Sequence, residues 1–133
     1  MRSSLRLIHP DDLDQCWPKV SAMLEAPLKL SNDSATADDV YKLLKDKQCM
    51  LWVTDEMALV LRAEGKALFA WLVAGENMDN WLEEVMNAAT RYAREFGYTH
   101  FKATVRPGMG RVLKRHGWTT AAEIMRREIL WTE

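Results

Sequence analysis

Residues 66–96 read KALFAWLVAGENMDNWLEEVMNAATRYAREF. The first part, residues 67–74, is almost continuously apolar, which indicates a strand covered on both faces. Apolar residues then recur at the spacing of a helix; they are Trp81, Leu82, Val85, Ala89, Tyr92, Ala93 and Phe96. The stretch therefore predicts a strand, a turn at residues 75–77 and a long helix. A turn of this kind is where a strand-to-helix unit usually meets a ligand.

The residues before this unit predict a first strand and a helix. Residues 5–9 are typical of a strand, and Pro10 begins a helix. Pro18 is expected to kink or restart this helix, because proline lacks the amide hydrogen that a helix interior needs. Pro27 is expected to end it. The buried stripe of the helix is Leu13, Trp17, Val20 and Leu24.

A second helix and three strands follow a loop at residues 30–35. Thr36 and Asp39 form a variant capping box, which predicts the start of the second helix. Strands are predicted at residues 49–54, 57–62 and 66–74. Because the turns between them are short, neighbouring strands should be antiparallel.

The residues after the long helix complete the predicted order. Gly97 is expected to be a left-handed C-cap. Residues 99–105 predict a strand reached through a helix, and therefore parallel to its predecessor. A short helix at residues 111–116 and two short strands within residues 118–131 follow. The prediction is one α/β (or α+β) domain over residues 1–133, with order βααβββαβαββ, a mixed sheet and helices on both faces.

Composition narrows the classes of function. With 133 residues, 48% hydrophobic and 28% charged, the chain is expected to be one globular domain. Its net charge of −1 gives no electrostatic reason for nucleic acid or an anionic membrane as the main partner. No apolar run reaches the roughly 20 residues that span a bilayer, and the first residues lack the apolar core of a signal peptide. We expect a cytoplasmic protein.

Residue types that carry chemistry are few. Cys16 and Cys49 are predicted to be buried, reduced thiols. The three histidines have no metal-ligand spacing, so no metal is expected. The serines lack the context of a nucleophile elbow, which gives hydrolase chemistry no support. Most of the six tryptophans are expected in the core, with one or two at an interface, which leaves a homodimer open.

The element order and the segment MGRVLKRHGW (residues 109–118) resemble the GNAT N-acetyltransferase superfamily. The resemblance covers essentially the whole chain. It implies that acetyl-CoA would bind where the strands at 66–74 and 99–105 splay apart. The pyrophosphate would then lie on backbone amides at the start of the long helix. The residues that would hold the pantetheine are Leu72, Val73 and Ala74, and those at the pyrophosphate are Gly75, Glu76 and Asn77.

Two departures from the family count against this site. The family's phosphate loop follows the pattern Arg/Gln-x-x-Gly-x-Gly/Ala, but residues 74–80 read AGENMDN, with one glycine and no basic residue. Acidic residues surround the start of the helix instead, and each close pair with a phosphate would repel by about 1 kcal/mol or more. They also stabilise the helix N-terminus by themselves. These acids are Glu76, Asp79, Glu83 and Glu84.

The second departure lies in the short helix. The tyrosine that often serves the family as general acid falls at Leu113, which cannot donate a proton. The asparagine common at the start of this motif falls at Arg106. No residue is therefore proposed as catalytic. The pattern resembles reduced GNAT-like proteins of tailed phages, some of which are associated with virions.

Residues 106–111, RPGMGR, are an alternative anion site built from Arg106, Gly108, Gly110 and Arg111. The competing interpretation is that Pro107 begins a helix and that the glycines allow tight packing. A wider basic region could receive RNA, DNA or an acidic protein, although the near-neutral chain makes nucleic acid the weaker hypothesis. It consists of Lys102, Arg106, Arg111, Lys114 and Arg115.

Two functions follow from these observations. The first is a non-catalytic or weakly active GNAT-like module that needs no cofactor and presents a rigid surface to a protein partner; it would be phage-encoded and act in the host cytoplasm or the virion. The alternative is an active N-acetyltransferase that moves acetyl from acetyl-CoA to an amine. Fold alone does not choose between them.

Overall fold

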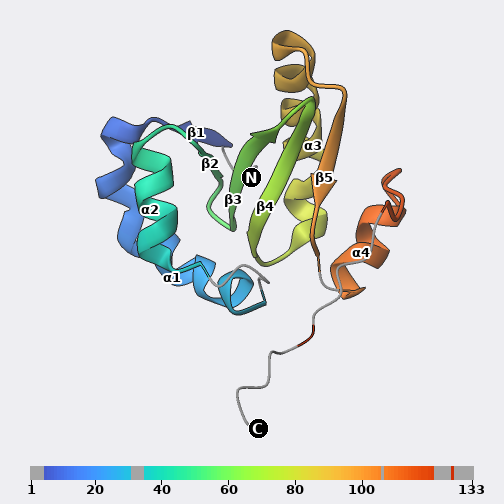
Figure 1. Cartoon of the computed structure of the whole chain (residues 1–133). Coiled ribbons are helices and arrows are strands. Elements are labelled where there is room, and N and C mark those ends of the chain that lie inside the picture. The colour runs from blue at the N-terminus through green and yellow to red at the C-terminus, as the bar shows by residue number, and fades with distance from the viewer. Residues whose placement is uncertain (1–4, 31–34, 106, 122–126, 128–133) are drawn as a thin grey trace, which may run out of the picture.

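The computed structural model describes residues 5–30, 35–105, 107–121 and 127 (Figure 1). Its elements are β1 (Arg6–Ile8), a 3₁₀ helix η1 (Pro10–Asp12), α1 (Leu13–Leu30), α2 (Ala37–Lys45), β2 (Met50–Val53), β3 (Met57–Glu64), β4 (Ala67–Gly75), α3 (Met78–Phe96), β5 (His100–Ala103) and α4 (Pro107–Lys114).

The five strands form one mixed sheet in the order β1-β2-β3-β4-β5. The first four are antiparallel neighbours, and β5 pairs with β4 in parallel. Figure 1 shows α1 and α2 on one side of this sheet and α3 on the other. The predicted α/β class, the meander and the parallel strand after the long helix are therefore confirmed.

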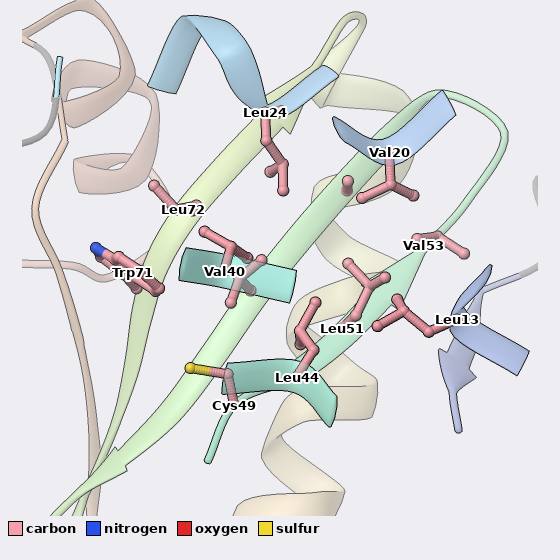
Figure 2. Packing of buried hydrophobic residues seen from close by; sticks show 13 residues of the cluster. Leu13, Val20, Leu24, Val40, Leu44, Cys49, Leu51, Val53, Trp71 and Leu72 are labelled. Carbon is pink, nitrogen blue, oxygen red and sulfur yellow. The ribbon is translucent and has the colours of Figure 1, made fainter. Parts of the chain in front are cut away.

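Two apolar clusters, one on each face of the sheet, hold these layers together. The cluster under α1 and α2 includes Leu13, Leu24, Val40 and Leu51, all at most 1% exposed (Figure 2). The cluster under α3 includes Trp81, Leu82 and Val85 and also takes up Leu113 of α4. β4 contributes to both clusters, as its unbroken apolar run predicts.

β4 contains a bulge that changes which face its side chains reach. Val60 is paired with Leu72, but the next residue of β3, Leu61, is paired with Ala70. Trp71 is thus the extra residue, and both Trp71 and Leu72 belong to the α1/α2 cluster. Pairing between β4 and β5 also ends here, with Ala70 opposite Ala103. The bulge therefore marks the point beyond which β4 has no partner in β5.

The first helix differs from the sequence prediction. α1 is one helix from Leu13 to Leu30 and contains both Pro18 and Pro27, so the expected end at Pro27 is wrong. A proline inside a helix costs about 3 kcal/mol. Burial on both sides of Pro18 offsets this cost, since Leu13, Val20 and Leu24 are at most 3% exposed. Tertiary packing therefore overrides the local signal.

Other boundaries follow the prediction more closely. Thr36 and Asp39 form the complete capping box, with Thr36 N to Asp39 Oδ2 at 2.9 Å. Gly97 is left-handed, with φ of 79°, at the C-terminus of α3. α4 begins at Pro107, about one turn before the predicted start, because proline suits the first helical position. Most of the predicted final hairpin lies outside the described residues.

Candidate functional site

The loop between β4 and α3 is packed against the turn between β2 and β3. Gly75 adopts φ of +141°, and a Cβ atom on it would lie 2.7 Å from Met57 Cα and closer still to the carbonyl oxygen of Glu56. Only glycine fits such an approach. In a phosphate loop such a glycine lets the backbone approach the ligand. Here Gly75 lets the loop approach the backbone of Glu56 and Met57.

Both peptide groups of Glu76 have partners inside the protein. Its N–H donates to the carbonyl oxygen of Glu56 at 3.1 Å. Its carbonyl oxygen accepts from the indole Nε1 of Trp81 at 2.8 Å. Trp81 is 3% exposed, so this bond is anchored in the core. An anion at this loop would therefore have to compete for the amide of Glu76.

Asn77 brings a carboxylate to the start of α3. It is left-handed, with φ of 56°, and its side chain makes no capping bond to the helix. Instead its Nδ2 donates to Oε2 of Glu56 at 2.7 Å. Glu56, Glu76 and Asp79 thus place three acidic side chains around the positive end of the helix dipole. The prediction missed Glu56 and the role of Trp81.

The residues predicted to hold pantetheine lie beyond the bulge of β4. Leu72 and Ala74 are buried in the α1/α2 cluster, and Val73 packs on the opposite face. Their side chains serve the core, so only their backbone could contact a ligand. The pairing of β4 with β5 ends at Ala70, so residues 72–74 of β4 are not paired with β5. Whether this segment holds pantetheine, as the resemblance implies, stays a prediction.

The alternative anion site receives no steric support. Gly108 and Gly110 lie inside α4 with helical backbone, and Cβ atoms on them would make only ordinary contacts, at 3.9 Å to Arg111 Nη2 and 3.8 Å to Val105 Cγ2. Neither tight packing nor a left-handed turn therefore requires these glycines. Arg111 is exposed. Arg106 lies outside the described residues, so the grouping of all four residues as an anion site stays a prediction.

Leu113, which the resemblance places at the position of the family's tyrosine, is part of the apolar core. Leu113 is 8% exposed and packs in the cluster under α3. It contributes apolar surface and has no proton to transfer.

Other chemistry is sparse in the described part of the chain. Cys16 is half-buried and Cys49 is buried; both are free thiols, and burial raises the pKa of each. The described residues hold no cluster of three potential metal ligands. None of the described helices is long and apolar enough to cross a membrane.

Solved structures share this arrangement over nearly the whole chain. An aminoglycoside acetyltransferase from an uncultured soil metagenomic sample, solved with sisomicin, is 14% identical; the match covers 98% of this chain and 97% of that chain, with a TM-score of 0.65. The chain has the GNAT fold. A GCN5-related N-acetyltransferase from Ralstonia eutropha JMP134 is 16% identical over 95% of this chain and 98% of that chain, with a TM-score of 0.62.

A third structure with the GNAT fold contains the coenzyme. It is an aminoglycoside N-acetyltransferase in complex with CoA, 13% identical over 96% of this chain and 95% of that chain, with a TM-score of 0.62. At such identities the likeness shows the fold and leaves the activity open. No protein-family model and no curated protein matches the sequence.

Proposed function

We propose that this chain is a GNAT-fold module that has lost the acetyl-CoA phosphate site and serves as a non-catalytic or weakly active binding or structural protein. One observation carries the proposal: Glu56 engages the loop twice, through its backbone oxygen to Glu76 and through its carboxylate to Asn77. A carboxylate beside the helix N-terminus supplies the negative charge that a phosphate would otherwise bring.

Electrostatics supports the same proposal. A pyrophosphate at this loop would approach Glu56, Glu76 and Asp79 without a basic residue in the loop to balance them. Each close like-charge pair near the surface is unfavourable by about 1 kcal/mol or more. The buried Leu113 adds that the usual proton donor for a departing thiolate is missing from its position.

The module would act by contact with a protein. The two large apolar side chains most exposed in the described chain are Leu7, at 54%, and Phe96, at 59%. Both lie on the α3 side of the sheet, because Leu7 is paired with Trp52 of the cluster under α3, and Phe96 of α3 lies 4.5 Å from Tyr92, which lies 5.9 Å from Trp52. This surface suits a second copy of the chain or another protein. On the resemblance to reduced GNAT-like proteins of tailed phages, we propose that such a module acts in the host cytoplasm or the virion.

One observation favours the alternative, an active N-acetyltransferase. β4 and β5 separate after Ala70 and Ala103, which leaves the edge of β4 free of β5 where pantetheine would lie. On this alternative, acetyl-CoA would bind along Leu72, Val73 and Ala74, and an amine would accept the acetyl group. The side chain of Leu113, at the position that the resemblance assigns to the family's tyrosine, has no proton to donate to the departing thiolate.

Thermal unfolding with acetyl-CoA in large excess distinguishes the two functions. Ligand at about 100 times its Kd would stabilise the fold by roughly 2.7 kcal/mol, a rise in Tm of several degrees. We expect no rise up to millimolar acetyl-CoA. A saturable rise would contradict the proposal and favour the enzyme.

Molar mass in solution, measured for wild type and for Phe96→Ser, tests separately whether the exposed apolar face joins two copies.

A further inference from the structure

A second polar cluster lies on the sheet, away from the phosphate loop. Arg62 of β3 is paired with Phe69 of β4, and Phe69 is paired with Lys102 of β5. Because paired residues share a face, these three side chains form a row across three strands on the α1/α2 face. α2 lies at the other end of the sheet from β5 (Figure 1). The side chains of Arg62 and Lys102 are 35% and 49% exposed, so solvent reaches the row.

Arg62 is held against two aromatic rings. Its guanidinium carbon lies 5.1 Å from the ring centre of Phe69 and 5.3 Å from that of Trp71. Stacking on aromatic faces is a favourable arrangement for a guanidinium. Phe69 and Trp71 are two positions apart on β4, so the regular alternation of the strand places both rings on this face.

Two hydrogen-bond donors in this cluster lack an acceptor among the described residues. Nε of Arg62 and Nε1 of Trp71 are both buried, and no described group accepts a hydrogen bond from either. Trp71 is 8% exposed, and Figure 2 shows its indole nitrogen at the margin of the apolar cluster, away from Val40. A buried donor without an acceptor is unfavourable, and native proteins usually satisfy such groups.

The charges of the cluster are unbalanced. Glu64 is shared by two cations, with Lys102 Nζ at 2.9 Å from Oε1 and Arg62 Nη2 at 3.5 Å from Oε2. One carboxylate therefore faces two positive groups. The hydrogen bond from Lys102 holds the pKa of Glu64 below its usual value. A second carboxylate would complete both the charge balance and the hydrogen bonding.

We propose that Arg62, Trp71 and Lys102 form a subsite for the carboxylate group of a ligand. One ligand oxygen accepts from the guanidinium of Arg62 and the other from the indole N–H of Trp71, while Lys102 adds charge from β5. Both nitrogens are buried in this structure, so the Arg62 side chain must change its rotamer before a ligand can reach them. This change needs no backbone movement. Planar paired donors suit a carboxylate especially well. The subsite does not depend on the phosphate loop.

Nuclear magnetic resonance of the indole N–H groups tests the subsite directly. The signal of Trp71 is identified as the one lost in Trp71→Phe, and sodium acetate is then titrated into the wild-type protein at constant ionic strength with chloride. We expect the Trp71 signal to move saturably while the other tryptophan signals stay in place. A Trp71 signal that does not move in tens of millimolar acetate would overturn the proposal.

Two variants separate the subsite from a general salt effect. Glu64→Gln removes the competing carboxylate and should lower the apparent Kd for acetate several-fold, whereas Arg62→Gln should abolish the saturable shift with the other indole signals unchanged. An equal response in both variants would contradict the assignment.

A blocked Ala-Asp-Ala tripeptide distinguishes two sources of the carboxylate. Tighter binding than acetate assigns the subsite to acidic segments of a protein, and equal binding assigns it to small carboxylates.

Discussion

The carboxylate of Glu56 accepts a 2.7 Å hydrogen bond from the side-chain amide of Asn77, although 21 residues separate the two in sequence. This bond joins the β2–β3 turn to the residue that precedes α3. The register of the sheet makes it possible, since Met57 is paired with Gly75 and brings the turn beside the loop. The protein's own acid thus lies at the helix N-terminus.

Removal of this carboxylate should loosen the loop. Glu56→Ala deletes the bond to Asn77 and leaves the backbone bond to Glu76 intact, so we expect a loss of about 0.5–1 kcal/mol in the free energy of unfolding. Asp55→Ala is the matched control, because it removes a neighbouring exposed acid of the same turn and should change stability by less than about 0.5 kcal/mol. Urea denaturation measures both. Equal losses would show that the Glu56–Asn77 bond contributes nothing.

Gly75 should be the least replaceable glycine in the described chain. In Gly75→Ala the new Cβ would meet the backbone of Glu56 and Met57, so we expect a loss of about 3 kcal/mol or more, or a failure to fold. Gly65→Ala is the comparison: Gly65 is also left-handed, with φ of +59°, but its Cβ would enter open space. Its cost should be about 1 kcal/mol. Similar melting temperatures for the two variants would mean that the close approach is not present in solution.

Gly110 should be improved by substitution. Its Cβ would lie at an ordinary 3.8 Å from Val105, and its backbone is helical, so Gly110→Ala should stabilise the protein by up to about 1 kcal/mol. Gly97→Ala, at the left-handed end of α3, should have the opposite sign. Thermal unfolding of the two variants gives the comparison. A destabilising Gly110→Ala would point to a role for this glycine that its packing does not explain.

The capping box of α2 should make stability depend on acidic pH. The backbone N–H of Thr36 donates to Asp39 and holds the pKa of this carboxyl below its usual 3.8. Since the unfolded chain takes up the proton first, the contribution of Asp39 is complete above pH 3.8 and is lost as pH falls through the lower, folded-state pKa. Asp39→Asn should therefore be less stable than wild type at neutral pH, with a difference that shrinks in acid.

Asp38→Asn is the control for this pH dependence. Asp38 lies in the same first turn of α2, and the capping bonds to Thr36 are made by Asp39 alone. Urea denaturation at a series of pH values should give wild type and Asp38→Asn the same acid dependence. A difference between wild type and Asp39→Asn that stays constant with pH would contradict the assigned bond.

Local signals in the sequence predicted much of the fold. The capping box at Thr36 and the left-handed Gly97 are local devices, and both are present as expected. α1 was mispredicted at Pro27 because long-range burial of Leu24 and its neighbours outweighs the local effect of proline. The bulge at Trp71 was not foreseen either, since an extra residue in an unbroken apolar run changes no pattern.

The candidate site was only partly predictable. The acids at residues 76–84 argued against a phosphate, but the decisive Glu56 lies on another turn and carries no motif. Its role depends on the register that sets Met57 opposite Gly75. Likewise, the row Arg62, Phe69 and Lys102 exists only once three strands are aligned. Sequence periodicity predicts which side chains share a face of one helix or strand. A site built from several strands also depends on the register between them, which periodicity does not predict.

The most direct test of the central claim follows the backbone amide signals of Glu76, Asn77 and Met78 by nuclear magnetic resonance during titration with CoA. If the loop is occupied by Glu56, these three signals stay in place up to millimolar CoA in the wild-type protein. A saturable shift of the Glu76 amide, together with its neighbours, would show that the pyrophosphate displaces Glu56 and would contradict the account.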